Sequence, residues 1–153
     1  MELSFRLDDL RGQEVQGLLE AHLLELAPLS PAESRHALDL EGLRASDVTF
    51  WSVWNETRLA GMGALKELDP GHGEIKSMHT VLAFRGRGVA ARILDHIMDE
   101  ARRRAYRRLS LETGSMAAMA PARALYDKYG FVDCAPFASY RLDPNSVFMT
   151  RTL

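Results

Sequence analysis

The chain has 153 residues, of which 46% are hydrophobic, and this length and composition are sufficient for one buried core. Lysine and arginine number 19 against 21 aspartate and glutamate, so the net charge of −2 excludes the strongly basic surface with which proteins bind nucleic acid or anionic membranes. We therefore predict a single domain over residues 1–153 with no nucleic-acid and no membrane partner.

The cysteine content and the N-terminus indicate a reducing, cytoplasmic location. The single cysteine, Cys134, has no partner for an internal disulfide, and the segment MELSFRLDDL lacks the cationic start and apolar stretch of a signal peptide. No apolar run approaches the roughly 18 residues that a membrane span needs. We interpret Cys134 as a buried small apolar residue, because no motif places a histidine beside it to form a nucleophilic pair.

The first half of the chain predicts a strand, two helices and three further strands. A weakly alternating strand at 3–7 precedes apolar residues at three- and four-residue steps, which are typical of an amphipathic helix, and this helix ends near Pro28. Pro31 begins a second predicted helix that extends to about Leu43, with Ser30 as its N-cap. Short polar turns then separate three strands of an antiparallel meander, at 48–54, 59–67 and 74–82.

The second half alternates helices and strands. Apolar residues at helical spacing predict a helix from about Gly88 to Ala105. Five arginines follow in or near its last turns, between 102 and 108. They favour a solvated helix end that complements the negative pole of the helix dipole over a binding patch for an anionic partner. The remaining predicted elements are a strand at 109–112, a helix at 121–129 ended by Gly130, and strands at 131–134 and 146–153.

The segment RGRGVA, residues 85–90, is the strongest functional motif in the chain. It lies between a predicted strand and a predicted helix, where backbone amides converge on an anion at the positively polarised helix N-terminus. Gly86 and Gly88 allow close approach of a phosphate and unusual backbone angles, and Arg85 and Arg87 add positive charge. These features predict a diphosphate site, although a tight turn beside a solvated face would use the same residues.

Two other phosphate motifs overlap this segment and fit less well. Gly86, Gly88 and Ala91 match the loose GxGxxA form of the dinucleotide fingerprint, but that fold begins with this unit and continues through parallel strands. Here the unit lies behind an antiparallel meander, with too few residues left for a doubly wound sheet. A Walker loop is excluded because Ile75 precedes Lys76 and Ser77 where that motif requires glycine.

The sequence resembles the GCN5-related N-acetyltransferase (GNAT) superfamily. Its fingerprint is Gln or Arg, two residues, Gly, one residue, and Gly or Ala, which Arg85, Gly88 and Ala90 satisfy. A second family element, alanine, two residues, leucine and tyrosine followed by glycine-phenylalanine, is matched within residues 122–131. The segment LETGSM and the tail DPNSVFMTRTL are similar to those of a subgroup of small bacterial acetyltransferases. The resemblance implies an α/β fold with a mixed, α+β-like sheet, the GNAT acyl-CoA N-acyltransferase fold, and it agrees with the predicted element order.

The resemblance also implies acetyl-CoA as cosubstrate and no metal. Exposed amides of the strand before the loop hold the pantetheine arm in this family, which places Met78 and Thr80 along that arm. The pyrophosphate would lie on the loop itself, formed by Arg85, Gly86, Arg87, Gly88, Val89 and Ala90. Two departures are Leu82, where many relatives have proline, and Met119, where many have an asparagine whose amide helps to hold the cofactor.

Acetylation of an amine requires a base, because an alkylammonium loses its proton only near pH 10. Glu74 is the first candidate, since it precedes Arg85 by 11 residues, the ungapped spacing of the general-base glutamate in the histone acetyltransferase branch. A solvated carboxylate at a strand end is the alternative interpretation. Glu112 and His79 are rivals, and strand alternation places His79 on the opposite face from Glu74.

The departing thiolate leaves more easily with a proton donor nearby. Tyr126 matches the general-acid tyrosine of the family, which follows the leucine at Leu125, whereas Tyr129 is interpreted as helix-end packing. Four aromatic residues are candidates for the lining of an acceptor pocket, although at least one of the tryptophans is expected in the core: Trp51, Trp54, Phe137 and Tyr140. The segment 136–145 is expected near the acceptor.

Together these features predict an N-acetyltransferase that passes the acetyl group of acetyl-CoA directly to an amine of a small molecule. Acetylation of a protein or peptide would require an open groove in place of a closed pocket. A non-catalytic acyl-CoA sensor would retain the 85–90 loop without an acid and a base. Dimers are common in the resembling family, which leaves a homodimer open.

Overall fold

The computed structural model describes residues 1–153, and its elements alternate much as the sequence predicts. Three short 3-10 turns, Ala32–Ser34, Leu82–Phe84 and Ala117–Met119, connect longer elements. The helices are α1 (Gln13–Leu26), α2 (Leu40–Leu43), α3 (Val89–Arg103) and α4 (Ala120–Lys128). The strands are β1 (Ser4–Leu7), β2 (Val48–Asn55), β3 (Arg58–Asp69), β4 (His72–Thr80), β5 (Arg108–Gly114), β6 (Val132–Asp133) and β7 (Ser146–Thr152).

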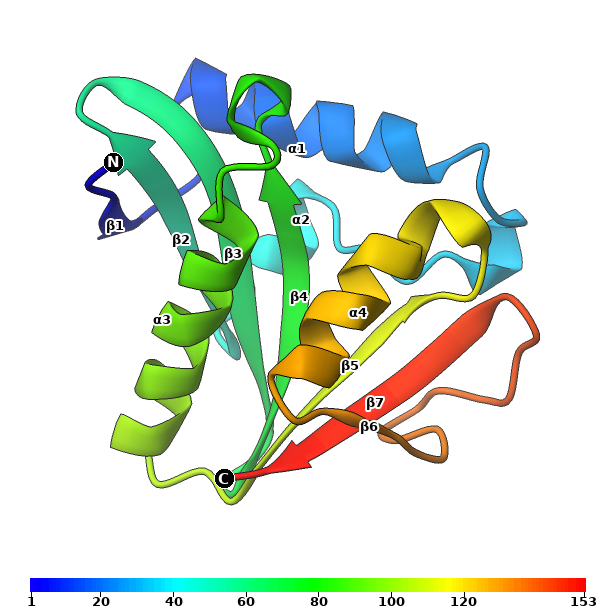
Figure 1. The fold of residues 1–153 in the computed structure, drawn as a ribbon. Coiled ribbons are helices and arrows are strands. Elements are labelled where there is room, and N and C mark those ends of the chain that lie inside the picture. Colours follow the sequence, from blue (N-terminus) through cyan, green and yellow to red (C-terminus); the bar gives the residue numbers. More distant parts are fainter.

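All seven strands form one mixed sheet in the order β1-β2-β3-β4-β5-β7-β6. Only β4 and β5 pair in parallel, and every other neighbouring pair is antiparallel. The helices lie on both faces, with α3 and α4 over one face and α1 and α2 over the other (Figure 1). The predicted α/β fold with a mixed sheet is therefore confirmed. The longest helix, α3, has 15 residues, and none of the helices has the length and apolar character that crossing a bilayer requires.

Each face of the sheet has its own core. The larger core lies under α3 and α4 and contains the predicted apolar stripe of α3, whose residues are all buried. Trp51 also belongs to this core, whereas Trp54 is half-buried at the rim and its indole N–H donates to Ser52. The smaller core, under α1 and α2, gathers apolar side chains from those helices and from β2 and β3. The expectation that at least one tryptophan is a core residue is confirmed.

The predicted second helix from Pro31 to Leu43 is wrong. A single 3-10 turn forms at its beginning, and a separate short helix, α2, begins only after Asp39, whose carboxylate accepts the backbone N–H of Gly42 at 2.9 Å. Between them the chain turns inward, and the Ser34 hydroxyl donates to Asp143 of the loop between β6 and β7. The hydrogen bond competes with helix formation. Because its partners are 109 residues apart, the local sequence around Ser34 does not predict it.

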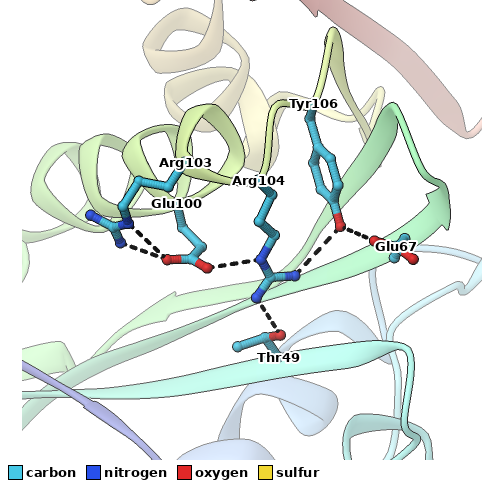
Figure 2. Close-up of polar contacts among 6 residues, drawn as sticks. All are labelled: Thr49, Glu67, Glu100, Arg103, Arg104 and Tyr106. Atoms are coloured by element: carbon cyan, nitrogen blue, oxygen red, sulfur yellow. Dashed lines mark hydrogen bonds and ion pairs between the residues drawn. The ribbon is translucent and has the colours of Figure 1, made fainter.

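Two of the arginines at the end of α3 have a structural role. Figure 2 shows Arg103 and Arg104 directed at Glu100 of the same helix, with N–O distances of 2.5 and 2.8 Å. Arg104 also donates to Thr49 of β2 at 2.8 Å and, weakly, to the Tyr106 hydroxyl at 3.4 Å. That hydroxyl donates to Glu67 of β3 at 2.6 Å. The network ties the end of α3 to the sheet, so Arg103 and Arg104 have a structural role in place of a partner-binding one.

Removing the phenol of Tyr106 tests this network. Tyr106→Phe keeps the buried ring and removes the hydrogen bond to Glu67, an exposed carboxylate that water can solvate, so we expect a loss of about 0.5 to 1 kcal/mol in the free energy of unfolding. Urea denaturation measures this loss. Because the network lies far along α3 from residues 85–90, binding of acetyl-CoA by the folded protein should be unchanged. Equal stability of the two proteins would show that the network contributes nothing.

Candidate functional site

The site is located where β4 and β5 separate. The two strands pair only at their first residues, from His72 opposite Arg108 to Glu74 opposite Ser110. Beyond this point they diverge, and Figure 1 shows them starting together near the C-terminus and moving apart with α4 lying over the space between them. Unpaired backbone groups of both strands are therefore left facing this space.

A β-bulge at Ser77 changes which face β4 presents. Opposite β3, Ala64 pairs with Lys76 and Met62 with His79, so β4 uses one residue more than β3, and Ser77 has a left-handed backbone with φ of 55°. Residues directly opposite each other share a face. His79 therefore lies on the same face as Lys76 and Glu74, toward α1. The prediction that His79 faces away from Glu74 is wrong, because simple alternation does not anticipate a bulge.

A cavity of about 120 Å³, called the inner cavity below, occupies the space between the diverging strands. Its walls come from the end of α1 and the loop after it, from β4 at 75–78, from β5 at 111–114, and from α4. The charged and imidazole side chains among its lining residues are His22, Arg35, His36, Lys76 and Glu112. Because the walls come from segments far apart in the sequence, the cavity exists only in the folded chain.

A second hollow, called the cradle groove below, has a volume of about 510 Å³ and follows the loop that connects β4 to α3. Gly86 and Gly88 have φ of 75° and 81°, in the left-handed region that favours glycine, and a Cβ added to either would meet no atom within 4 Å. No backbone N–H from Gly86 to Ala90 donates to a backbone carbonyl, so these groups are available to a ligand.

The cradle groove gathers all but one of the residues predicted to bind a cofactor. Residues from α4 and from the 3-10 turn before it line the groove as well. The exception is Arg87, whose guanidinium lies over the Phe84 ring at 5.2 Å from its centroid. Arg85 lines the groove, but its charge is shared, since it donates to Glu25 of α1 at 2.8 Å. The residues brought together are Met78, Thr80, Arg85, Gly86, Gly88, Val89 and Ala90.

Tyr126 and Met78 line both the inner cavity and the cradle groove, and so form the partition between them. The Tyr126 side chain is buried, with its hydroxyl 3.9 Å from the Met78 sulfur. Burial raises the pKa of Tyr126 to about 12, so the phenol keeps its proton at neutral pH. It therefore has the position and the protonation state of a donor between the two hollows.

Glu74 is buried deeper than the base assignment assumes. Its side chain is 3% exposed, and its carboxylate receives the Lys76 ammonium at 3.1 Å and the Tyr140 hydroxyl at 2.5 Å. Glu74 does not line the inner cavity, whereas Lys76 does. Glu112 does line it, and burial raises the pKa of this carboxyl. Of the two carboxylates, Glu112 is the one placed to contact a molecule in the inner cavity directly.

Several polar residues of the site were not anticipated. The sequence assigns no role to Lys76 or His22 and places Tyr140 only near the acceptor. Tyr140 and Glu74 are 66 residues apart, so no local pattern reveals their hydrogen bond. Cys134, predicted to be buried, is partly exposed because it follows the two-residue strand β6 at the sheet edge.

No cluster of three or more potential metal ligands is present.

The buried imidazole of His22 makes stability depend on pH. Burial lowers its pKa from 6.5 to about 4, so below pH 6.5 the unfolded chain binds more protons, and stability present above pH 6.5 is lost as the pH falls toward 4. Between pH 7 and pH 5 we expect this residue to account for a loss on the order of 2 kcal/mol. Urea unfolding of His22→Gln at both pH values should show a shallower decrease than wild type, and an identical decrease would contradict the assignment.

Comparison with known proteins agrees with this geometry. Residues 15–131 match the family model described as "Acetyltransferase (GNAT) family". The chain is 55% identical over 151 residues to the uncharacterized N-acetyltransferase YsnE of Bacillus subtilis (strain 168), covering 99% of this chain and 100% of that one. It is 51% identical over 150 residues to the uncharacterized N-acetyltransferase YedL of Escherichia coli (strain K12), covering 98% and 94%.

Among solved structures, a protein from Klebsiella pneumoniae that is described as an acyl-CoA N-acyltransferase superimposes with a TM-score of 0.77 at 27% identity, covering 99% of this chain and 97% of that one. The sheet with diverging central strands, the glycine loop at the start of α3 and the match over most of the sequence all point to the same family. The chain belongs to the acetyltransferase (GNAT) family and is an acetyl-CoA-dependent acyltransferase.

Proposed function

We propose that residues 1–153 act as one domain that transfers the acetyl group of acetyl-CoA directly to an amine of a small molecule. The observation that carries this proposal is the partition formed by Met78 and Tyr126, which separates the cradle groove from the inner cavity. A thioester in the groove and an amine in the cavity would meet at this partition. Holding both reactants at one point makes a two-substrate transfer effectively unimolecular, which lowers the entropic part of its barrier.

Acetyl-CoA would occupy the cradle groove. The free amides from Gly86 to Ala90 suit the pyrophosphate, because they are unpaired and stand at the positive pole of α3. Met78 and Thr80 suit the pantetheine arm, because they lie in the part of β4 that no longer pairs with β5. Arg87, directed at Phe84, would contribute its backbone amide, with its charge acting from a distance.

For the proton transfers we propose Tyr126 as the acid that protonates the departing thiolate. Glu74 remains a proposal for the base, but a proton would reach its carboxylate only past Lys76 and Tyr140, which already donate to it. Glu112 reaches the inner cavity without an intermediary, and its raised pKa makes it a stronger acceptor of a proton. Substitution of each by glutamine separates the two assignments.

The size of the inner cavity favours a small acceptor. A volume of about 120 Å³ between two strands and the loop after α1 receives a compact molecule or the end of one, whereas a folded protein substrate would need an open groove. A sensor that only binds acyl-CoA would need neither this cavity nor the Tyr126 phenol beside it. Both features therefore support catalysis over sensing.

Thermal unfolding followed by a transfer assay tests the proposal. A ligand present at 100 times its dissociation constant stabilises the native state by about 2.7 kcal/mol, so acetyl-CoA should raise the unfolding temperature while NAD and ATP should not. A panel of small primary amines, compared with a lysine-containing peptide, should then release free thiol from acetyl-CoA. Protection without thiol release from any amine would favour the sensor, and release only with the peptide would overturn the small-molecule acceptor.

A further inference from the structure

Among the charged and titratable side chains that line the inner cavity, cations and imidazoles outnumber carboxylates. Glu112 is the only carboxylate in its lining, whereas Arg35 and Lys76 are cations and two imidazoles, His22 and His36, complete the charged and titratable set. These residues come from α1, the loop after it, β4 and β5, so the excess of donors is a property of the folded cavity. A ligand that fits such a lining carries an acceptor of hydrogen bonds, most effectively an anion.

A chain of hydrogen bonds makes His22 a donor toward this cavity. Arg85 can only donate, and its Nη2 lies 3.3 Å from Nε2 of His79. Burial lowers the pKa of His79, so its ring is neutral at pH 7 and carries its single proton on the other nitrogen, Nδ1. That Nδ1 lies 3.0 Å from Nδ1 of His22 and donates to it. Glu25 does not reverse this order, because its carboxylate is 3.6 Å from His79, beyond hydrogen-bond distance.

The consequence is that the single proton of the neutral His22 ring is on Nε2. His22 lines the inner cavity, its Nδ1 is engaged with His79, and Nε2 makes no hydrogen bond to another residue. The ring therefore offers an N–H to whatever occupies the cavity. Donors from two residues thus face the same cavity. His22 on α1 is buried, and Arg35, thirteen positions later in the chain, is exposed.

Arg35 supplies the charge. Its Nε donates to the carbonyl of Ser30 at 2.9 Å, which holds the guanidinium stem in place, and no carboxylate lies within ion-pair distance of it. Lys76 differs, since its ammonium is neutralised by Glu74 at 3.1 Å. Arg35 is consequently the cation of the inner cavity whose charge is not balanced by the protein, and guanidinium has the planar fork that binds carboxylates.

We propose that the acceptor of this acetyltransferase carries a carboxylate as well as its amine, with the carboxylate held by Arg35 and the Nε2–H of His22. This inference rests on the proposed function, because it identifies the acceptor class of the same cavity. The amine would lie toward Glu112, Met78 and Tyr126, where the cavity meets the cradle groove. An amino acid or a similarly compact amino carboxylate satisfies both ends.

Matched pairs of amines test the proposal in the free-thiol assay. Alanine and ethylamine form one pair, and phenylalanine and phenethylamine a second, each differing only by the carboxylate. A charge-assisted contact changes affinity about 10- to 100-fold, so we expect kcat/KM for the carboxylated member to exceed that of its partner by at least 10-fold. Arg35→Gln should remove most of this preference, and Arg35→Lys should restore part of it.

The control variant is Arg102→Gln, which removes one positive charge from the exposed end of α3, where Arg102 forms an ion pair with Asp99. It should leave the preference unchanged. Equal or better acetylation of the decarboxylated partner, or a decrease in both members with Arg35→Gln, would overturn the proposal. If wild type acetylates no amine, the proposed function fails, and the carboxylate site is then judged alone by thermal protection with propionate and phenylacetate. Protection lost in Arg35→Gln supports the site, and absence of protection overturns it.

Discussion

Tyr126→Phe should lower kcat by about 100-fold while leaving the binding of acetyl-CoA nearly unchanged. General acid catalysis contributes about 10²- to 10⁴-fold, and the substitution removes only the hydroxyl from a ring that stays packed against Met78 and Phe131. The raised pKa of about 12 means that the phenol is a donor over the whole neutral range. Steady-state free-thiol release measures kcat, and thermal protection by acetyl-CoA measures binding.

Tyr129→Phe is the matched control for this prediction. Its hydroxyl lies near the surface at the end of α4, 3.4 Å from Asp95, and contacts neither hollow. We expect activity within twofold of wild type. An unaltered kcat in Tyr126→Phe would reject the acid assignment, since a packing role survives the loss of one oxygen. Equal decreases in both variants would indicate instead that α4 has moved.

Gly88→Ala should abolish protection by acetyl-CoA and raise its KM by at least tenfold. The residue precedes α3 with φ of 81°, a conformation that costs an alanine roughly 1 kcal/mol, and its added Cβ would stand in open space beside the free amides. That open space is where we place the pyrophosphate. The methyl group would therefore obstruct the ligand in addition to straining the loop.

Gly130→Ala separates strain from obstruction. This glycine follows α4 with φ of 86°, so alanine meets a similar backbone penalty, but its Cβ would contact only Arg151 at 3.6 Å and lies away from the cradle groove. Both variants should lose comparable stability in urea, and only Gly88→Ala should lose protection by acetyl-CoA. Retained protection in Gly88→Ala would contradict the placement of the pyrophosphate on this loop.

The cradle and the order of elements follow from local sequence. A glycine-rich segment between an apolar strand and an amphipathic helix acts through its own backbone, so the type and spacing of six neighbouring residues suffice to predict it. The stripe of α3 and the meander depend likewise on periodicities of a few residues. In these parts of the fold, residues that lie close together in space are also close together in the sequence.

The inner cavity was decided by tertiary structure. Glu74 contacts Tyr140 across 66 residues, Ser34 contacts Asp143 across 109, and His22 meets His79 across 57. The bulge at Ser77, which turns His79 toward α1, is visible only in the register between β3 and β4. Sequence alone therefore predicted the family, the fold and the position of the glycine loop before α3, because short-range patterns encode them. The charged residues that an acceptor would contact come from segments distant in sequence, which only the tertiary structure brings together around the gap between β4 and β5.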